Sequence, residues 1–293
     1  MTTSKQQGVA LIQVLLITAI IALIAIQFTK TARQQVAIAS SFNDRIKAEL
    51  LLRTYQSRVL FTLFKHDPDE LTRQTVNGVQ WNFRGQPVQL ADNVTFTMQS
   101  TAGLMSLVTS PDKYWFRLLT HFSVPTNQQI EIMDSLKDWI DIDNDRRTQG
   151  AEASYYLGQG LAVPRNGPLQ HISELKFIKG ITPTLYQQLK PLVTIYPTGA
   201  FSPALAPKTL NEALFTADVA TQISDAQTQG PFTEQVWAGI VGNGDDANID
   251  LHPRNTFLIT LTVHQGDVEL TKHLDVKVQS QKAAEPIIIL ASY

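Results

Sequence analysis

An acidic stretch near the middle of the chain carries the residues best suited to chemistry. It reads DIDNDRRTQGAE, and when Asp141 is counted as position one, carboxylates fall at positions one, three, five and twelve: Asp141, Asp143, Asp145 and Glu152. Alternate hard oxygens that wrap an ion, closed by a distal glutamate, are the ligand pattern of a calcium loop. Clustered carboxylates also repel one another unless a cation lies among them. The spacing therefore predicts a calcium site.

The loop departs from an EF-hand at position six, where glycine is expected and Arg146 stands. The alternative is a solvated acidic loop in which Arg146 and Arg147 pair locally with the carboxylates. Other chemistry has little support, because the six histidines lack ligand spacing and the two Ser-x-x-Lys matches lack their partner motifs. The chain has no cysteine, which excludes disulfides and thiolate metal sites. A net charge of −2 without a basic block gives no support to a nucleic-acid partner.

The acidic loop lies inside a largely helical region, about residues 101–248. A run that opens at Pro125 and carries Ile130, Met133 and Leu136 at helical spacing predicts a helix leading into the loop. A region of this size is too long for a surface loop and must have a core of its own.

The segment before this region predicts a long helix that begins in a membrane. Val9 to Phe28 contains no charged residue, and a helix of that length covers roughly 30 Å, the hydrocarbon thickness of a bilayer. A removed signal peptide would have a shorter apolar core followed by a small-x-small site, so a retained span is favoured. An apolar stripe with polar residues on the other faces then continues to Asp67-Pro68, which predicts one helix from Val9 to about His66.

Strand patterns lie on both sides of the helical region. Residues 75–99 alternate with turn signals such as Asn77-Gly78, and Thr256–Val263 and Val268–Val278 flank Gln265-Gly266-Asp267, a hairpin signal. We expect the strands to pack on the exposed stripe of the helix. The predicted fold class is α+β: a long N-terminal helix packed on a small antiparallel sheet, with a large inserted all-α domain.

The N-terminus resembles precursors of the type IV pilin-like family. The resemblance is carried by a short leader ending in Gly8, then Val9-Ala10-Leu11-Ile12 and the apolar run. It implies a pilin-like fold and cleavage after Gly8 by a prepilin peptidase, with methylation of the new terminus at Val9. Pilins normally carry glutamate at the fifth mature position, and in this chain that residue is Gln13.

The change at Gln13 predicts a tip position rather than a shaft position. In lipid the ammonium of a neighbouring subunit's new N-terminus is costly to bury, and a carboxylate in the subunit below offsets that cost. A subunit with nothing above it has no such ammonium to neutralise, so a neutral amide is tolerated there. The alternative is that Gln13 is merely a polar residue accepted within the span.

The inserted region is similar to the K-type minor pseudopilins of type II secretion systems. The motifs that carry this are Asp138-Trp139-Ile140-Asp141, Gly150-Ala151-Glu152, Tyr155-Tyr156-Leu157, Ser173-Glu174-Leu175 and Ile178-Lys179-Gly180-Ile181-Thr182-Pro183. The resemblance implies sterile-alpha-motif-like units and calcium binding in this region, with Asp138 as a further candidate ligand. Ala153 replaces a family aspartate, and the resemblance weakens after Pro207.

Together these observations predict a leader at 1–8, a transmembrane helix at 9–29, a pilin-like helix with the first strands at 30–100, an inserted helical domain at 101–248 and closing strands at 249–293. The resemblance implies a non-enzymatic, single-pass inner-membrane protein with its bulk in the periplasm. Its implied role is at the tip of the pseudopilus, helping to initiate and cap assembly for export of folded proteins, with I-type and J-type minor pseudopilins and other pseudopilins as partners. The alternatives are a signal-anchored periplasmic enzyme and a tip subunit of a type IV pilus.

Overall fold

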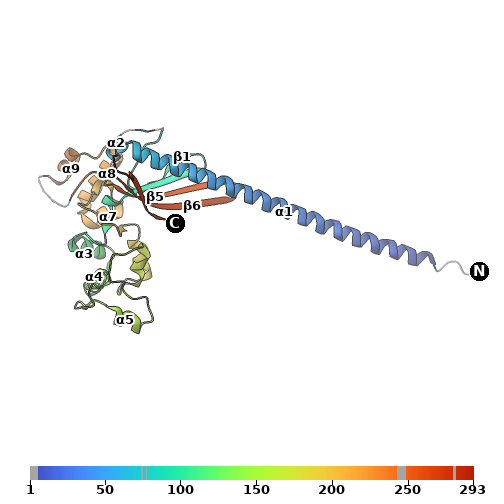
Figure 1. The fold of residues 1–293 in the computed structure, drawn as a ribbon, viewed down its shortest axis with the longest axis horizontal. Helices are drawn as coiled ribbons and strands as arrows, with labels where there is room; N and C mark the ends of the chain where they lie inside the picture. Colours follow the sequence, from blue (N-terminus) through green and yellow to red (C-terminus); the bar gives the residue numbers. More distant parts are fainter. Residues whose placement is uncertain (1–5, 74, 77, 243–248, 280–281) are drawn as a thin grey trace, which may run out of the picture.

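The structure is a computed structural model that describes residues 6–73, 75–76, 78–242, 249–279 and 282–293. A single long helix leads into a five-stranded antiparallel sheet, and a mainly helical region hangs to one side of that sheet (Figure 1). The predicted α+β class, with a long helix on an antiparallel sheet, is confirmed. Residues 1–5 of the predicted leader lie outside the described residues.

Helix α1 runs over Gln6–Lys65, close to the predicted bounds of Val9 to about His66. Its C-terminal third places one stripe against the sheet at three- and four-residue steps, and Ala48, Leu52, Val59 and Leu63 are buried there. The helix ends at the predicted point. Asp67 accepts a bond from the Asp69 amide at 2.8 Å and starts the short helix α2, Pro68–Arg73.

The sheet has the strand order β1-β2-β5-β6-β7, and every neighbouring pair is antiparallel. The bounds are Val88–Ala91 for β1, Val94–Ser100 for β2, Thr256–Gln265 for β5, Val268–Val278 for β6 and Ile287–Ser292 for β7. The β5–β6 hairpin confirms the strands predicted on both sides of Gly266, whose φ of +57° suits the turn. Around the other predicted turn the structure has only the isolated bridge between Val76 and Val79, and Asn77 lies outside the described residues.

The region between β2 and β5 is mainly helical. Its longer helices are α3 at Asp112–His121, α4 at Thr126–Ile140, α5 at Ala153–Gly158, α6 at Pro183–Leu189, α7 at Lys208–Leu214, α8 at Ala217–Gln229 and α9 at Glu234–Val241; short 3-10 turns η1, η2 and η3 cover Thr101–Gly103, Ile172–Phe177 and Pro203–Leu205. The region is not purely α, because β3 at Met105–Ser106 pairs in parallel with β4 at Val193–Thr194. The boundary predicted at residue 248 lies outside the described residues.

Two large cores meet where the inserted region joins the sheet. One core lies among α3, α4, α6 and α7, and the other lies between α1 and the sheet. Ala102, Ala204 and Leu205 belong to the sheet-side core although they come from the inserted region. The backbones touch closely there: a Cβ on Gly103 would lie 2.2 Å from the carbonyl oxygen of Leu205. Two segments of the insertion thus pack backbone against backbone beside the sheet-side core, and the Thr101 hydroxyl donates to the carbonyl of Thr256 in β5 at 3.2 Å.

Candidate metal centre and membrane helix

Three of the predicted ligands come together at the end of the inserted region. Asp141 is the C-cap of α4 and Glu152 is the N-cap of α5, so the two helix ends hold the loop that carries Asp143. One carboxylate oxygen from each of these three residues lies within 4.8 Å of the other two. An oxygen-only donor set with this spacing suits a hard cation such as calcium.

The cluster runs from the exposed Asp143 inward to the buried Glu152, and its inner oxygens lack hydrogen-bond donors. Glu152 is 4% exposed, and in the described part of the chain neither of its carboxylate oxygens has a hydrogen-bond partner. The Oδ1 atom of Asp141 is also buried without a partner. Uncompensated charge of this kind is costly in a folded protein, and a cation among the three oxygens would remove the cost. The residues therefore fit a bound metal ion.

Arg147, which lies inside the loop, forms ion pairs with Asp138 and with Asp141 of the cluster. The Arg147 guanidinium Nη1 donates to Asp138 Oδ1 at 2.7 Å and also to Asp141 Oδ2, and the Arg147 amide donates to Asp138 as well. These bonds raise the pKa of Arg147 above its ordinary value, so its charge is permanent. Asp138 is fully buried, and a Cβ on Gly150 would lie 1.9 Å from Asp138 Oδ2. Asp138 thus anchors the loop through Arg147 and lies outside the three-residue cluster.

Hydrogen bonds between side chains and the backbone fix the path of the loop around the cluster. Asp143 Oδ1 accepts from the Asp145 amide at 2.9 Å, which turns the chain, and Asn166 donates to the carbonyl of Asp143 at 2.8 Å. On the other side the Gln149 amide donates to Asp134 at 3.0 Å. The carboxylate of Asp145 is exposed and is not part of the cluster, although the sequence spacing predicts it as a ligand.

The electrostatics of Glu152 follow from this geometry. Burial raises the pKa of Glu152 above 4.5, and the negative charges of Asp138 and Asp141 raise it further. In the absence of a cation the protein therefore favours the protonated form of this side chain more than the unfolded chain does. A divalent ion would reverse that preference because it stabilises the carboxylate.

The acidic loop and the local pairing of an arginine with it could be predicted from the sequence, whereas the role of Asp138 could not. Arg147 pairs locally, as the alternative interpretation expects, while Asp141 and Glu152 keep oxygens without partners among the described residues; the calcium site stays a prediction. The role of Asp138 as the partner of Arg147 was missed, since nothing in the spacing separates an anchor from a ligand. Behind the loop, Trp139 packs edge-on against the fully buried Tyr156 at 5.1 Å, which ties α4 to α5.

Comparison with known proteins shows which protein family this chain resembles. The family model described as "Type II secretion system (T2SS), protein K" matches residues 101–198, the part that contains the acidic cluster. A protein-K relative from Escherichia coli (strain K12) is 30% identical over 245 residues, 77% of this chain and 74% of the relative. The chain belongs to the type II secretion protein K family of minor pseudopilins. A second relative, type II secretion system protein K of Pectobacterium carotovorum, is 31% identical over 68% of this chain and 66% of its own length.

The fold agrees with a solved member of the protein K family. One chain in the crystal structure of the GspK-GspI-GspJ complex from enterotoxigenic Escherichia coli superimposes with a TM-score of 0.66, covering 86% of this chain and 97% of that one at 19% identity. At this identity the likeness establishes the fold.

The N-terminal part of helix α1 has an exposed apolar surface that suits a membrane or contact with other helices. Its N-terminal part is long and apolar enough to span a bilayer, and it is wholly unburied in the isolated chain. Ile12 is 65% exposed and Phe28 is 75% exposed. Gln13 lies exposed within this apolar surface, and the backbone of Gly8 and Val9 is already helical. Lipid or neighbouring helices must cover these side chains.

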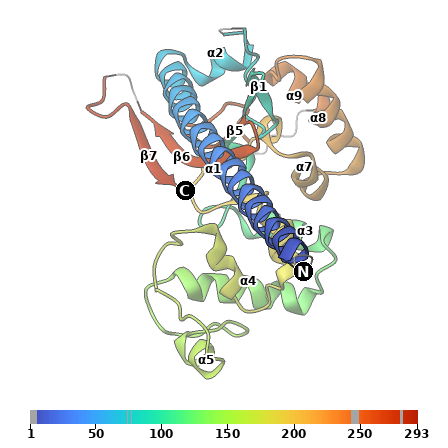
Figure 2. The same cartoon turned by 90° about the vertical axis from the view of Figure 1, so that its right-hand side faces the viewer.

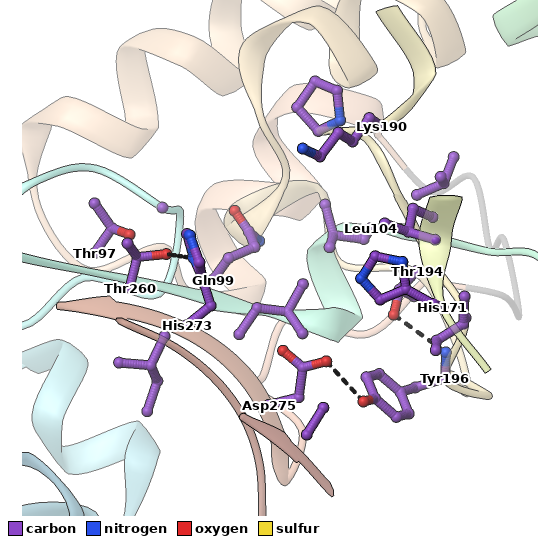
Figure 3. A pocket seen from close by; sticks show the side chains of 18 of the residues that line it. Thr97, Gln99, Leu104, His171, Lys190, Thr194, Tyr196, Thr260, His273 and Asp275 are labelled. Carbon is purple, nitrogen blue, oxygen red and sulfur yellow. Dashed lines mark hydrogen bonds between the residues drawn. The ribbon is translucent and has the colours of Figure 1, made fainter. Parts of the chain in front are cut away.

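A cleft of about 640 Å³ marks the joint between the sheet and the inserted region (Figure 3). Thr97, Gln99, Thr260, His273 and Asp275 line it from the sheet, and Leu104, His171, Lys190, Thr194 and Tyr196 line it from the inserted region. The Tyr196 hydroxyl donates to Asp275 Oδ2 at 2.7 Å across the joint. The ring of Tyr293 stacks on His273 and meets His171 edge-on, so aromatic contacts among lining residues also cross the joint.

Proposed function

We propose that this protein is a structural minor pseudopilin at the tip of the type II secretion pseudopilus, where it helps to initiate and cap assembly for export of folded proteins. The observation that carries the proposal is the pairing of an uncovered apolar helix with a bulky lateral domain, in a chain of the protein K family. A helix of this kind needs neighbours, whereas a domain of this size beside the sheet hinders stacking of a further subunit above it. Neither the anchored-enzyme alternative nor the type IV pilus alternative gains support from the family match.

The partners follow from the solved relative, whose structure is a complex with GspI and GspJ. The I-type and J-type minor pseudopilins are therefore the proposed partners here, together with other pseudopilins and the inner membrane, with the bulk of the chain in the periplasm. Co-expression of the full chain with its I-type and J-type subunits in detergent should give a ternary complex. Failure of the three chains to co-purify under conditions in which each is folded would refute this assignment.

Processing by a prepilin peptidase is proposed at the Gly8–Val9 bond. Mass spectrometry of protein from cells that contain the peptidase should find a mature chain that begins at Val9, with one added methyl group. Gly8→Ala should abolish that species and leave the full-length precursor. An unprocessed chain that still supports secretion would instead indicate a simple signal anchor.

The tip position is tested through Gln13. A shaft subunit needs a carboxylate for the ammonium of the subunit above, and a tip subunit does not. Gln13→Glu should let the chain enter the shaft, so crosslinks along the filament should appear that the unaltered chain lacks. If the unaltered chain already crosslinks throughout the shaft, Gln13 does not define the tip.

Calcium is the proposed ion at the acidic cluster, held by Asp141, Asp143 and Glu152. When bound, it would neutralise the clustered carboxylates, of which Glu152 is buried, and join the end of α4 to the start of α5. Its role is therefore structural: Arg147 orients Asp141, and the ion fixes the loop that shapes the far end of the inserted region.

A further inference from the structure

The sheet has one edge that is open to another strand. Strand β7 pairs with β6 on one side, and among the described residues no strand pairs with its other side. Figure 2 shows β7 at the margin of the molecule with β6 on its inner side. Its sequence, IIILAS, contains no charged residue and no proline. Natural edge strands usually carry such residues to prevent pairing with other chains.

The backbone register tells which polar groups of β7 point outward. The Gln279 amide donates to the carbonyl of Pro286 at 2.7 Å, and the register then pairs Val278 with Ile287, Lys277 with Ile288 and Val276 with Ile289. Antiparallel pairs alternate between bonded and non-bonded. Because the Gln279–Pro286 pair is bonded, Ile288 bonds inward, whereas the N–H and C=O groups of Ile287 and Ile289 point away from the sheet.

The apolar layer beneath the sheet is partly exposed to solvent at the β7 edge. Val276 of β6 is fully buried, but Ile289, its direct partner on the same face, is 46% exposed. Helix α1 packs on β5 and β6, and Ile287 still touches the core under the sheet. A strand added beside β7 would extend this layer and cover Ile289.

The opposite edge is protected in ways that β7 is not. Strand β1 has four residues, with a register shift between Gln89 and Ala91. Beside it, Arg84 donates to the carbonyl of Gln227 in α8, so a helix flanks that edge. Strand β7 also has an irregularity, at Leu290, but it comes after Ile287–Ile289 and leaves that stretch regular.

We propose that the outer edge of β7 accepts an extended strand from the I-type or J-type partner subunit, bonded to the outward N–H and C=O groups of Ile287 and Ile289. This inference rests on the proposed function, which supplies a partner chain held beside this one. The edge specifies the chemistry of the occupant: an extended segment with an apolar side chain over Ile289. A helix packed on the same face would cover the side chains without bonding the amides.

Residue-resolved hydrogen exchange on the full chain in detergent, alone and in the ternary complex, tests the proposal. On complex formation the amides of Ile287 and Ile289 should exchange at least about tenfold more slowly, because they gain partners. The amide of Ile288, already bonded to β6, serves as the internal control and should change little. A complex that forms without slowing at Ile287 and Ile289 would overturn the β7 proposal and leave the proposed function intact. Absence of any complex would overturn both.

A variant pair separates the amide from the side chain. Proline is tolerated at an edge position whose N–H faces outward, so Ile289→Pro should fold yet bind the partner about five- to tenfold more weakly. Ile289→Val keeps the amide and should bind within about twofold of the unaltered chain. Circular dichroism of both variants verifies folding. Equal affinity in a folded Ile289→Pro variant, or concentration-dependent slowing at Ile287 in the chain alone, would contradict a partner strand; the latter would indicate a second copy.

Discussion

Glu152 and Asp275 are both buried acids, 4% and 9% exposed, but their surroundings differ. Asp275, at the joint between sheet and insertion, accepts the Tyr196 hydroxyl at 2.7 Å. Glu152 lies at the far end of the insertion, and among the described residues no donor reaches its carboxylate oxygens with full hydrogen-bond geometry, although the Ala153 amide is close; two further acids lie nearby. Burial raises the pKa of both. Tyr196, His171 and His273 counteract the rise at Asp275, whereas at Glu152 the charges of Asp138 and Asp141 add to the rise and only the Ala153 amide opposes it.

Asp275 thus receives a hydrogen bond from another side chain of the protein, whereas we propose that the charge of Glu152 is balanced by a bound ion. The joint is complete within the chain and holds the insertion to the sheet. If calcium completes the acidic loop, as we propose, the far end of the insertion should depend on calcium whereas the joint should not.

The largest effect should come from calcium itself. At a free concentration of about one hundred times the dissociation constant, binding to the folded state alone adds about 2.7 kcal/mol. For a chain of this size that corresponds to roughly 4–5 °C in Tm. Thermal unfolding of the full chain in detergent with calcium, and then with a chelator in excess, measures the shift. Magnesium at the same concentration is the control, and an unchanged Tm under chelation would mean that the loop is merely solvated.

Removing the donor at the joint should have the next largest effect. Tyr196→Phe leaves the buried carboxylate of Asp275 without its hydroxyl partner, which should cost about 1–3 kcal/mol of the free energy of unfolding. The loss should be the same with and without calcium, because the joint lies in another part of the molecule from the metal centre. Denaturant unfolding under both conditions checks this. A loss that disappears on adding calcium would show that the two sites are coupled.

A smaller effect, opposite in sign, is expected at Glu152. In the presence of chelator, Glu152→Gln removes a buried charge that has no partner, and the variant should be more stable than the unaltered chain by about 1 kcal/mol. With calcium the order should reverse, since the variant lacks a ligand. If the substitution destabilises the calcium-free protein, Glu152 must have an internal partner and the contrast with Asp275 fails.

The pH dependence of the calcium-free protein gives a further, smaller test. Because the folded pKa of Glu152 is raised above 4.5, its favourable contribution is present below pH 4.5 and is lost as the pH rises through the folded value. The stability difference between Glu152→Gln and the unaltered chain should therefore grow as the pH increases above 4.5. Other groups, including Asp275, are common to both proteins and cancel. A difference that is flat with pH would contradict the raised pKa.

Much of the fold was accessible from sequence because its signals are local. The stripe of α1 and the turn at Gly266 mark a helix and a hairpin without help from distant residues. Strand β7 was not predicted, since Ile287 to Leu290 is a continuous apolar run without alternation. The β3–β4 pair was also missed, because it joins Met105 to Val193 across most of the insertion and has only two residues on each side.

Prediction of the candidate site from sequence has the same limit: local spacing can be interpreted, but contacts between distant residues cannot. The spacing of the acids correctly identified a loop that gathers Asp141, Asp143 and Glu152. It could not tell that Asp145 would be exposed outside the cluster, or that Arg147 would bond to Asp138 and to one oxygen of Asp141. Those outcomes depend on how α4 and α5 are packed, through contacts such as Trp139 on Tyr156. Ligand type is therefore readable from sequence, whereas ligand selection within a loop depends on tertiary structure.

Calorimetric titration of calcium into the full chain, with Glu152→Gln and Asp145→Asn as a matched pair, is the most direct test of the metal centre. The structure predicts binding by the unaltered chain, a similar affinity in Asp145→Asn and at least about a hundredfold loss in Glu152→Gln, since a ligand of the ion is removed. No binding by the unaltered chain, or an equal loss in the two variants, would contradict the account.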